Sequence, residues 1–146
     1  MAYRGQAGRA RGFTLIELLV VIAIIAIASA GVTFAMRDSS QTKLEREAQR
    51  LAALLESARA QSRSSGTPVL WRVTASGFRF EGLAPGALPQ NWMGEAISVQ
   101  GPDSLLLGPE PIIGKQAIVL SAGAAGQTLR IATDGLRPFT VQAGEP

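Results

Sequence analysis

The sequence predicts an α+β fold in which one long N-terminal helix, first transmembrane and then amphipathic, packs on a small, mainly antiparallel β-sheet domain. Three observations lead to this prediction. Residues 18–36 carry no charged side chain, residues 44–62 repeat apolar side chains at helical spacing, and apolar and polar residues alternate from Val69 onward. The β-rich part, residues 66–146, has only about 80 residues and would be marginal alone, so we expect the helix to complete its core.

Residues 1–12 form a basic segment with three arginines and no acidic residue. Positive charges beside an apolar run keep that flank in the cytoplasm, so we expect the C-terminal domain to lie across the membrane. The same three arginines account for the formal charge of +3, because without them 11 basic residues (14 − 3) face 11 acidic ones.

Residues 13–36 are predicted to form a transmembrane helix. The 19 residues from Leu18 to Met36 (36 − 18 + 1) are uncharged. As a helix they would extend about 28 Å, close to the thickness of about 30 Å of a bilayer's hydrocarbon core. Glu17 stands directly before this run. A carboxylate in a membrane segment costs free energy, so by default its presence indicates a function. A buried carboxylate needs a partner.

Residues 12–17, Gly-Phe-Thr-Leu-Ile-Glu, stand between the basic segment and the apolar run. This arrangement resembles the N-terminal signal of type IV pilins and type II secretion pseudopilins, in which a prepilin peptidase cuts after the glycine and methylates the new N-terminus. The resemblance implies cleavage between Gly12 and Phe13, N-methylation of Phe13 and removal of residues 1–12 as a leader. It also implies that Glu17, then the fifth residue, pairs with the terminal amine of a neighbouring subunit during assembly.

Two other interpretations of this region remain open. One is an ordinary secretory signal peptide, with Ala28-Ser29-Ala30 as an A-x-A-like cleavage site. The other is a plain single-span anchor. Neither explains the carboxylate of Glu17 between the basic and apolar parts.

Residues 37–65 are predicted to continue the helix as an amphipathic segment. No Gly or Pro interrupts them, and Gly66 and Pro68 then end the helix. We expect Glu47 and Arg50 to pair on the water-facing side. A helical stripe recurs at spacing 4-3-4-3-4 and is expected to face the core of the C-terminal domain: Leu44, Ala48, Leu51, Leu55, Ala58 and Ser62.

Residues 66–146 are predicted to form a β-rich globular domain. A hairpin is expected over residues 69–81, with Trp71 facing the core, and Asp134-Gly135 is expected to form a tight turn before the last strand. The other predicted strands are residues 96–100, 104–107, 117–121, 127–133 and 138–143.

The composition excludes several kinds of catalytic and metal site. The chain has no cysteine and no histidine, so Cys/His zinc sites, Ser-His-Asp triads and Cys-His dyads are ruled out. We predict no catalytic residue, no metal ligand and no cofactor, and hence not an enzyme. Trp92, in a loop rich in Pro and Gly, is a candidate for a partner contact. Arg130 and Arg137 are candidate nucleic-acid contacts in an alternative interpretation, against which the neutral charge of residues 13–146 argues.

Later segments are similar to one branch of the pilin family, the H-type minor pseudopilins of type II secretion and the related fimbrial T/U minor pilins. The similar segments are residues 47–59, 65–72, 77–80 and 134–141. The resemblance implies a pilin-like fold and a single-pass inner-membrane protein with a periplasmic domain. It also implies a structural subunit near the tip of the pseudopilus, where its partners are other minor and major pseudopilins, the prepilin peptidase and inner-membrane lipid. The alternative is a minor pilin of a type IV pilus that binds DNA during uptake.

Overall fold

The computed structural model describes residues 13–94, 97–123 and 127–144, without the side chains of residues 32–39. The predicted leader, residues 1–12, lies outside the described residues. The chain divides into two compact units, residues 1–36 and residues 37–146.

Helix α1 extends from Leu15 to Ser65, 51 residues, and confirms the prediction of one long N-terminal helix. At its start the hydroxyl of Thr14 accepts the amide N–H of Glu17 at 3.3 Å, as an N-cap residue does. At its end Gly66 adopts a φ of +67°, the left-handed conformation in which glycine terminates helices. Among the residues that the structure describes, no helix combines the length and the apolar character that crossing a membrane requires.

The predicted stripe on α1 is the face of the helix that the C-terminal domain covers. All six of its residues are at most 1% exposed. The stripe joins one apolar cluster with side chains from both sheets and from the loop before Gln116, among them Trp71, Phe78, Leu105, Ile113, Ile118 and Ile131. The prediction of a core-facing stripe is therefore confirmed.

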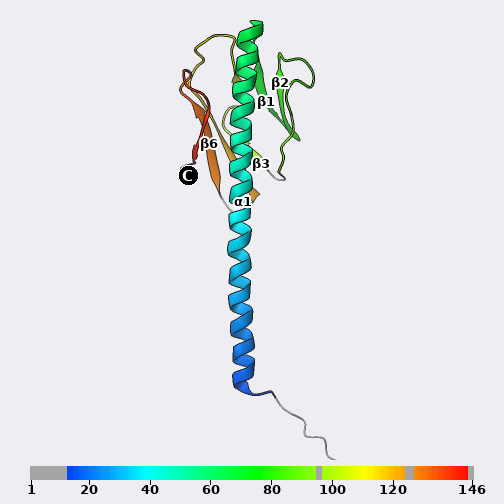
Figure 1. Ribbon diagram of the computed structural model, residues 1–146, viewed down its shortest axis with the longest axis vertical. Helices are drawn as coiled ribbons and strands as arrows, with labels where there is room; N and C mark the ends of the chain where they lie inside the picture. Colours follow the sequence, from blue (N-terminus) through cyan, green and yellow to red (C-terminus); the bar gives the residue numbers. More distant parts are fainter. Residues whose placement is uncertain (1–12, 95–96, 124–126, 145–146) are drawn as a thin grey trace, which may run out of the picture. The chain divides into compact units, whose positions relative to one another are not determined.

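The described strands form two antiparallel sheets beside the part of α1 that Figure 1 draws in cyan and green. One has the order β2-β1-β4 and the other β3-β5-β6-β7. Strands of the first sheet are β1 (Leu70–Thr74), β2 (Gly77–Glu81) and β4 (Ser104–Leu106). Strands of the second are β3 (Ile97–Gln100), β5 (Gln116–Ala122), β6 (Thr128–Thr133) and β7 (Thr140–Ala143).

The predicted hairpin is β1-β2, in which Trp71 lies opposite Phe80 and Val73 lies opposite Phe78. Trp71 is fully buried, as expected from its place in the alternating pattern. The sequence did not predict that the strands would divide into two sheets, since the assignment of strands to sheets depends on pairing between distant segments.

The predicted tight turn at Asp134-Gly135 is wrong. β6 ends at Thr133 and β7 begins at Thr140, so six residues, 134–139, connect them. The carboxylate of Asp134 accepts the N–H groups of Leu136 and Arg137 at 2.9 and 2.8 Å, and this local turn competes with a two-residue hairpin.

Gly135 is required for a different reason. Its φ is +94°, and a Cβ at this position would collide with the carbonyl oxygen of Ile113. The amide of Ile113 in turn donates to the carbonyl of Gly135 at 3.3 Å. A close approach of two backbone segments, rather than a tight hairpin turn, therefore explains this glycine.

Replacing Leu51 by Asp is expected to unfold the C-terminal domain. Leu51 is fully buried at the middle of the stripe, where a carboxylate would lie among apolar side chains without a partner. Thermal unfolding followed by circular dichroism should lose its cooperative transition. The control is Gln49→Asp, which places the same charge on the exposed side of the helix. An unchanged transition for L51D would refute the assigned packing.

Candidate assembly segment and the polar network of the C-terminal domain

The predicted processing and assembly residues lie at the start of α1. Phe13 is 81% exposed and precedes the helix, while Gly12 lies outside the described residues. Glu17 is exposed in the first turn, and among the described residues no cation forms an ion pair with it. The Thr14-x-x-Glu17 spacing also suits a capping box, so Glu17 is well placed at a helix N-terminus even in the single chain.

The side chains that follow Glu17 form an apolar surface. Large apolar residues in this part of α1 are between 44% and 77% exposed: Leu15, Ile16, Leu18, Leu19, Val20, Val21, Ile22, Ile24, Ile25 and Ile27. Soluble monomers rarely expose so many consecutive apolar side chains, and such surfaces mark contacts with lipid or with other protein chains.

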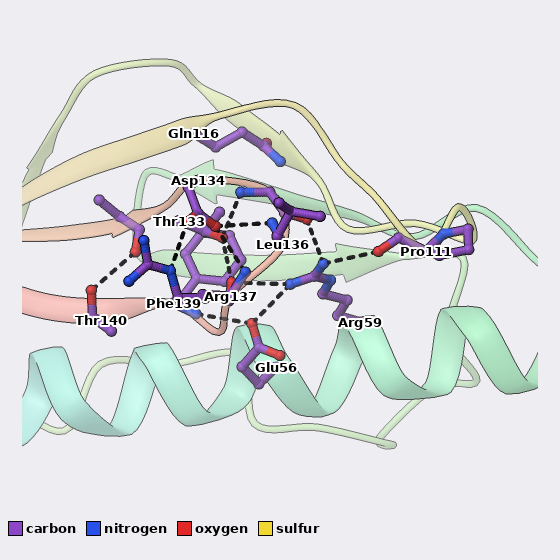
Figure 2. A network of polar contacts seen from close by, with 12 residues as sticks. Glu56, Arg59, Pro111, Gln116, Thr133, Asp134, Leu136, Arg137, Phe139 and Thr140 are labelled. Carbon is purple, nitrogen blue, oxygen red and sulfur yellow. Dashed lines mark hydrogen bonds and ion pairs between the residues drawn. The ribbon is translucent and has the colours of Figure 1, made fainter.

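Within the C-terminal domain, Arg59 on α1 is a buried cation that binds three backbone carbonyls of two segments (Figure 2). Its side chain is 2% exposed. Nη2 donates to the carbonyl of Gly135 at 2.7 Å and to that of Pro111 at 3.2 Å. Nη1 donates to the carbonyl of Arg137 at 3.3 Å. The guanidinium thus fixes the β6–β7 connection and the loop before β5 against the helix.

Glu56 completes this network from one turn earlier on α1. Its Oε1 lies 3.5 Å from Arg59 Nη1 and also accepts the amide N–H of Phe139 at 3.0 Å. A buried charge is tolerated when it is paired and hydrogen-bonded, and the Glu56 carboxylate together with three carbonyls provides this for the two terminal nitrogens of Arg59. The buried Nε of Arg59 has no hydrogen-bond partner among the described residues.

A second charged pair binds the loop that precedes β3. Glu47 and Arg50 are paired at 2.8 Å as predicted, but Glu47 is only 3% exposed, so the expectation of a water-facing pair is wrong. The other oxygen of Glu47 accepts the amide N–H of Met93 at 3.0 Å, and Arg50 donates to the carbonyl of Asn91 at 3.1 Å. Pairing with the loop backbone is what buries the carboxylate.

Trp92 lies in the loop that this pair binds. Its ring is partly buried against the core, with its centroid 4.6 Å from that of Phe78. The neighbouring Met93 is 72% exposed. Trp92 therefore contributes to the fold, and its predicted contact with a partner stays a prediction.

Arg130 and Arg137 are both exposed and line the same hollow in the domain surface. Arg130 Nη1 donates to Oε1 of Gln142 at 3.3 Å, and Arg137 Nε donates to Oδ2 of Asp134 at 2.9 Å. The backbone N–H of Arg137, that of Leu136 and the Arg137 side chain lower the pKa of Asp134 from 3.8 to about 2. The structure thus brings the two predicted arginines together.

Sequence reasoning did not single out Glu47 or Arg59 as buried charges. A signal was present, because each shares the helical spacing of the stripe. Glu47 precedes Leu51 by four residues, and Arg59 follows Leu55 by four. A charged residue on an otherwise apolar helix face therefore indicates a buried polar contact, although only the fold identifies the partner.

The described residues contain no group of three or more acidic, histidine or cysteine side chains that could bind a metal ion.

Comparison with known proteins gives two matches. Residues 8–33 match the prokaryotic N-terminal methylation motif, which includes the predicted cleavage and methylation positions. The chain is also 36% identical over 84 residues to type II secretion system protein H of Escherichia coli strain K12. The chain is thus similar to a type II secretion protein H over part of its length. The match covers 56% of this chain and 48% of the relative, so the chain spans about half the length of the curated protein that it matches.

No solved structure matches the chain.

Replacing Arg59 by Met should destabilise the C-terminal domain by about 3 kcal/mol or more. Methionine fills similar space but leaves the Glu56 carboxylate without its cation and removes one donor from each of the three carbonyls that Arg59 binds. Denaturant unfolding measures this loss. Arg63→Met, one turn further along α1 at an exposed position, is the matched control. A loss below 1 kcal/mol for R59M would mean that the network does not stabilise the fold.

The Asp134 turn predicts a pH dependence of stability. Folding lowers the pKa of this carboxyl from 3.8 to about 2, so its stabilising effect is complete above about pH 4 and is lost as the pH falls towards 2. Asp134→Asn resembles the protonated carboxyl at every pH. The melting temperature of the variant should therefore lie below that of the unmodified protein at pH 6, and the difference should disappear near pH 2.

Asp103→Asn serves as the control for this experiment, since the exposed Asp103 carboxylate forms no ion pair or side-chain hydrogen bond in the described residues. A difference for D134N that stays constant between pH 6 and pH 2 would contradict the assigned role of the carboxylate.

Proposed function

We propose that this protein is a minor pseudopilin of a type II secretion system, a structural subunit near the tip of the periplasmic pseudopilus that helps to export folded proteins. The observation that carries the proposal is the methylation motif, with Phe13 and Glu17 at the start of an exposed apolar helix segment, in a chain similar to secretion protein H. The predicted partners are other minor and major pseudopilins and the prepilin peptidase.

Residues 13–36 are proposed to anchor the protein in the inner membrane before assembly, with the C-terminal domain in the periplasm. The uncharged run from Leu18 to Met36 and the exposed apolar side chains between Leu15 and Ile27 support this anchoring. The three arginines before Gly12 favour a cytoplasmic leader, which the prepilin peptidase would reach at the membrane surface.

Glu17 is proposed to stabilise the assembled subunit relative to the single chain in the membrane. A carboxylate in the membrane costs about 2.5–3.5 kcal/mol on insertion scales. Glu17 is exposed and has no cationic partner among the described residues, so in the single chain the helix N-terminus offsets only part of this cost. The methylated amine of Phe13 on a neighbouring subunit would supply the missing positive charge, which would favour incorporation in register.

The second candidate function is that of a type IV minor pilin that binds DNA during uptake. Arg130 and Arg137, exposed and lining one hollow, favour it. The equal numbers of basic and acidic residues in residues 13–146 argue against it, because affinity for DNA arises mainly from neutralised phosphates. An enzymatic role has no support from the composition, which lacks histidine and cysteine.

Deletion of the gene in its source organism tests the proposal. Loss of exoprotein release with normal twitching motility and DNA uptake is the expected result, because a pseudopilin acts in secretion alone. Lost motility or uptake with normal secretion would reject the proposal in favour of the type IV pilus.

Complementation of the deletion with Glu17→Gln separates processing from assembly. Mass spectrometry should find the mature N-terminus at methylated Phe13 in both the unmodified protein and the variant, whereas secretion should recover only with the unmodified protein. Thr14→Ala is the control, since it removes the N-cap of α1 and keeps the carboxylate. Normal secretion by E17Q would show that pairing of Glu17 is dispensable.

A further inference from the structure

The outer face of the sheet β3-β5-β6-β7 contains a hollow of about 410 Å³. Ile118, Leu120 and Ile131 point inward to the core, so the alternate residues of β5 and β6 point outward. The hollow exists because small residues occupy that outer face at its centre. Ala117 lies opposite Ala132, and Ala132 lies opposite Thr140 on β7.

Longer side chains bound the hollow at both ends. At one end Arg130 stands opposite Gln142, two residues along β6 from Ala132. At the other end are Lys115 and Arg137, together with Asp134. Residues 130 and 134 are four positions apart, which corresponds to about 13 Å between their Cα atoms in an extended chain, so an extended segment of similar length can reach from one end to the other.

Arg130 and Lys115 have no acidic partner among the described residues, and Arg137 is paired with one carboxylate. Gln142 positions Arg130 through one hydrogen bond and leaves its charge in place. Asp134 binds Arg137 only through Nε, and the described residues offer the terminal nitrogens of Arg137 no further hydrogen bond. Among the described residues Lys115 has no ion pair. The hollow therefore carries three positive charges against one negative charge.

We propose that this hollow binds an extended acidic segment of another protein, in which two carboxylates separated by three residues contact Arg130 at one end and Arg137 with Lys115 at the other. Side-chain guanidinium groups bind carboxylates with paired, directional hydrogen bonds. The apolar floor of Ala117 and Ala132 accepts the small residues between the two acidic ones. The inference does not depend on the secretion role, which would only make the partner a neighbouring subunit.

Nucleic acid fits this hollow less well than a protein segment. A sugar-phosphate backbone would place a phosphate charge every few ångströms, whereas the hollow offers cations only at its two ends. The floor also offers apolar contact rather than further cations. Two separated carboxylates match the charges that are present.

Titration of the ¹⁵N-labelled full chain in non-ionic detergent micelles with the peptide acetyl-Gly-Asp-Ala-Ser-Ala-Asp-Gly-amide tests the proposal. The amide signals of Ala117, Ala132 and Thr140 should shift on binding at low salt. Arg130→Gln and Arg137→Gln should each weaken binding about fivefold or more, as the loss of a charge-assisted contact does. The same peptide with Asn in place of both Asp residues should produce no shift at these positions.

Arg46→Gln is the matched control variant, because it removes an exposed arginine of α1 that lies outside the hollow, and its affinity should stay within about twofold of the unmodified protein. Absence of binding, equal binding of the Asn peptide, or unchanged affinity in R130Q and R137Q would each overturn the proposal. Displacement of the peptide by equimolar 12-base-pair DNA, or by equimolar inorganic phosphate, would also overturn it, in favour of a nucleic-acid or a simple anion site.

Discussion

Burial of one face of α1 is the constraint on which the C-terminal domain depends. The two sheets share no strand in the described residues, and they meet in an apolar cluster whose helical side is the stripe from Leu44 to Ser62. Complete burial of a leucine side chain is worth about 1.5–3 kcal/mol, so the three leucines of the stripe contribute about 5–9 kcal/mol. That is comparable with the whole stability of a small domain, about 5–15 kcal/mol. Without the helix, neither sheet has a core of its own.

Two buried charged pairs add specificity to this apolar packing. Apolar contact alone would allow the loops to pack on the helix in several orientations. Hydrogen bonds require defined partners and directions. Arg59 with Glu56 selects the backbone of the β6–β7 connection, and Glu47 with Arg50 selects the loop before β3. Each pair therefore places a surface loop whose side chains are exposed, Leu136 in one case and Met93 in the other.

The molecule presents two surfaces of different chemistry for contacts with other molecules. The start of α1 is apolar apart from the carboxylate of Glu17, and its chemistry suits lipid or the packed helices of a filament. The outer face of the second sheet is polar and cationic, with an apolar floor, and its chemistry suits a directional contact with an acidic partner. The first surface suits contact with any apolar neighbour, whereas the second can distinguish one partner from another.

The sequence by itself determined the features that depend on local order along the chain. The charge-free run, the methylation motif, the continuous helix and its apolar stripe follow from composition and from a period of 3.6 residues, and the β1-β2 hairpin follows from a period of two. Tertiary structure decided the features that depend on contacts between segments distant in the sequence. It divided the strands into two sheets, buried Glu47 and Arg59 against loops more than 40 residues away, and lengthened the Asp134 turn through local hydrogen bonds. It also brought Arg130, Arg137 and Lys115 around one hollow, because the strand register places residues that are distant in the sequence next to one another.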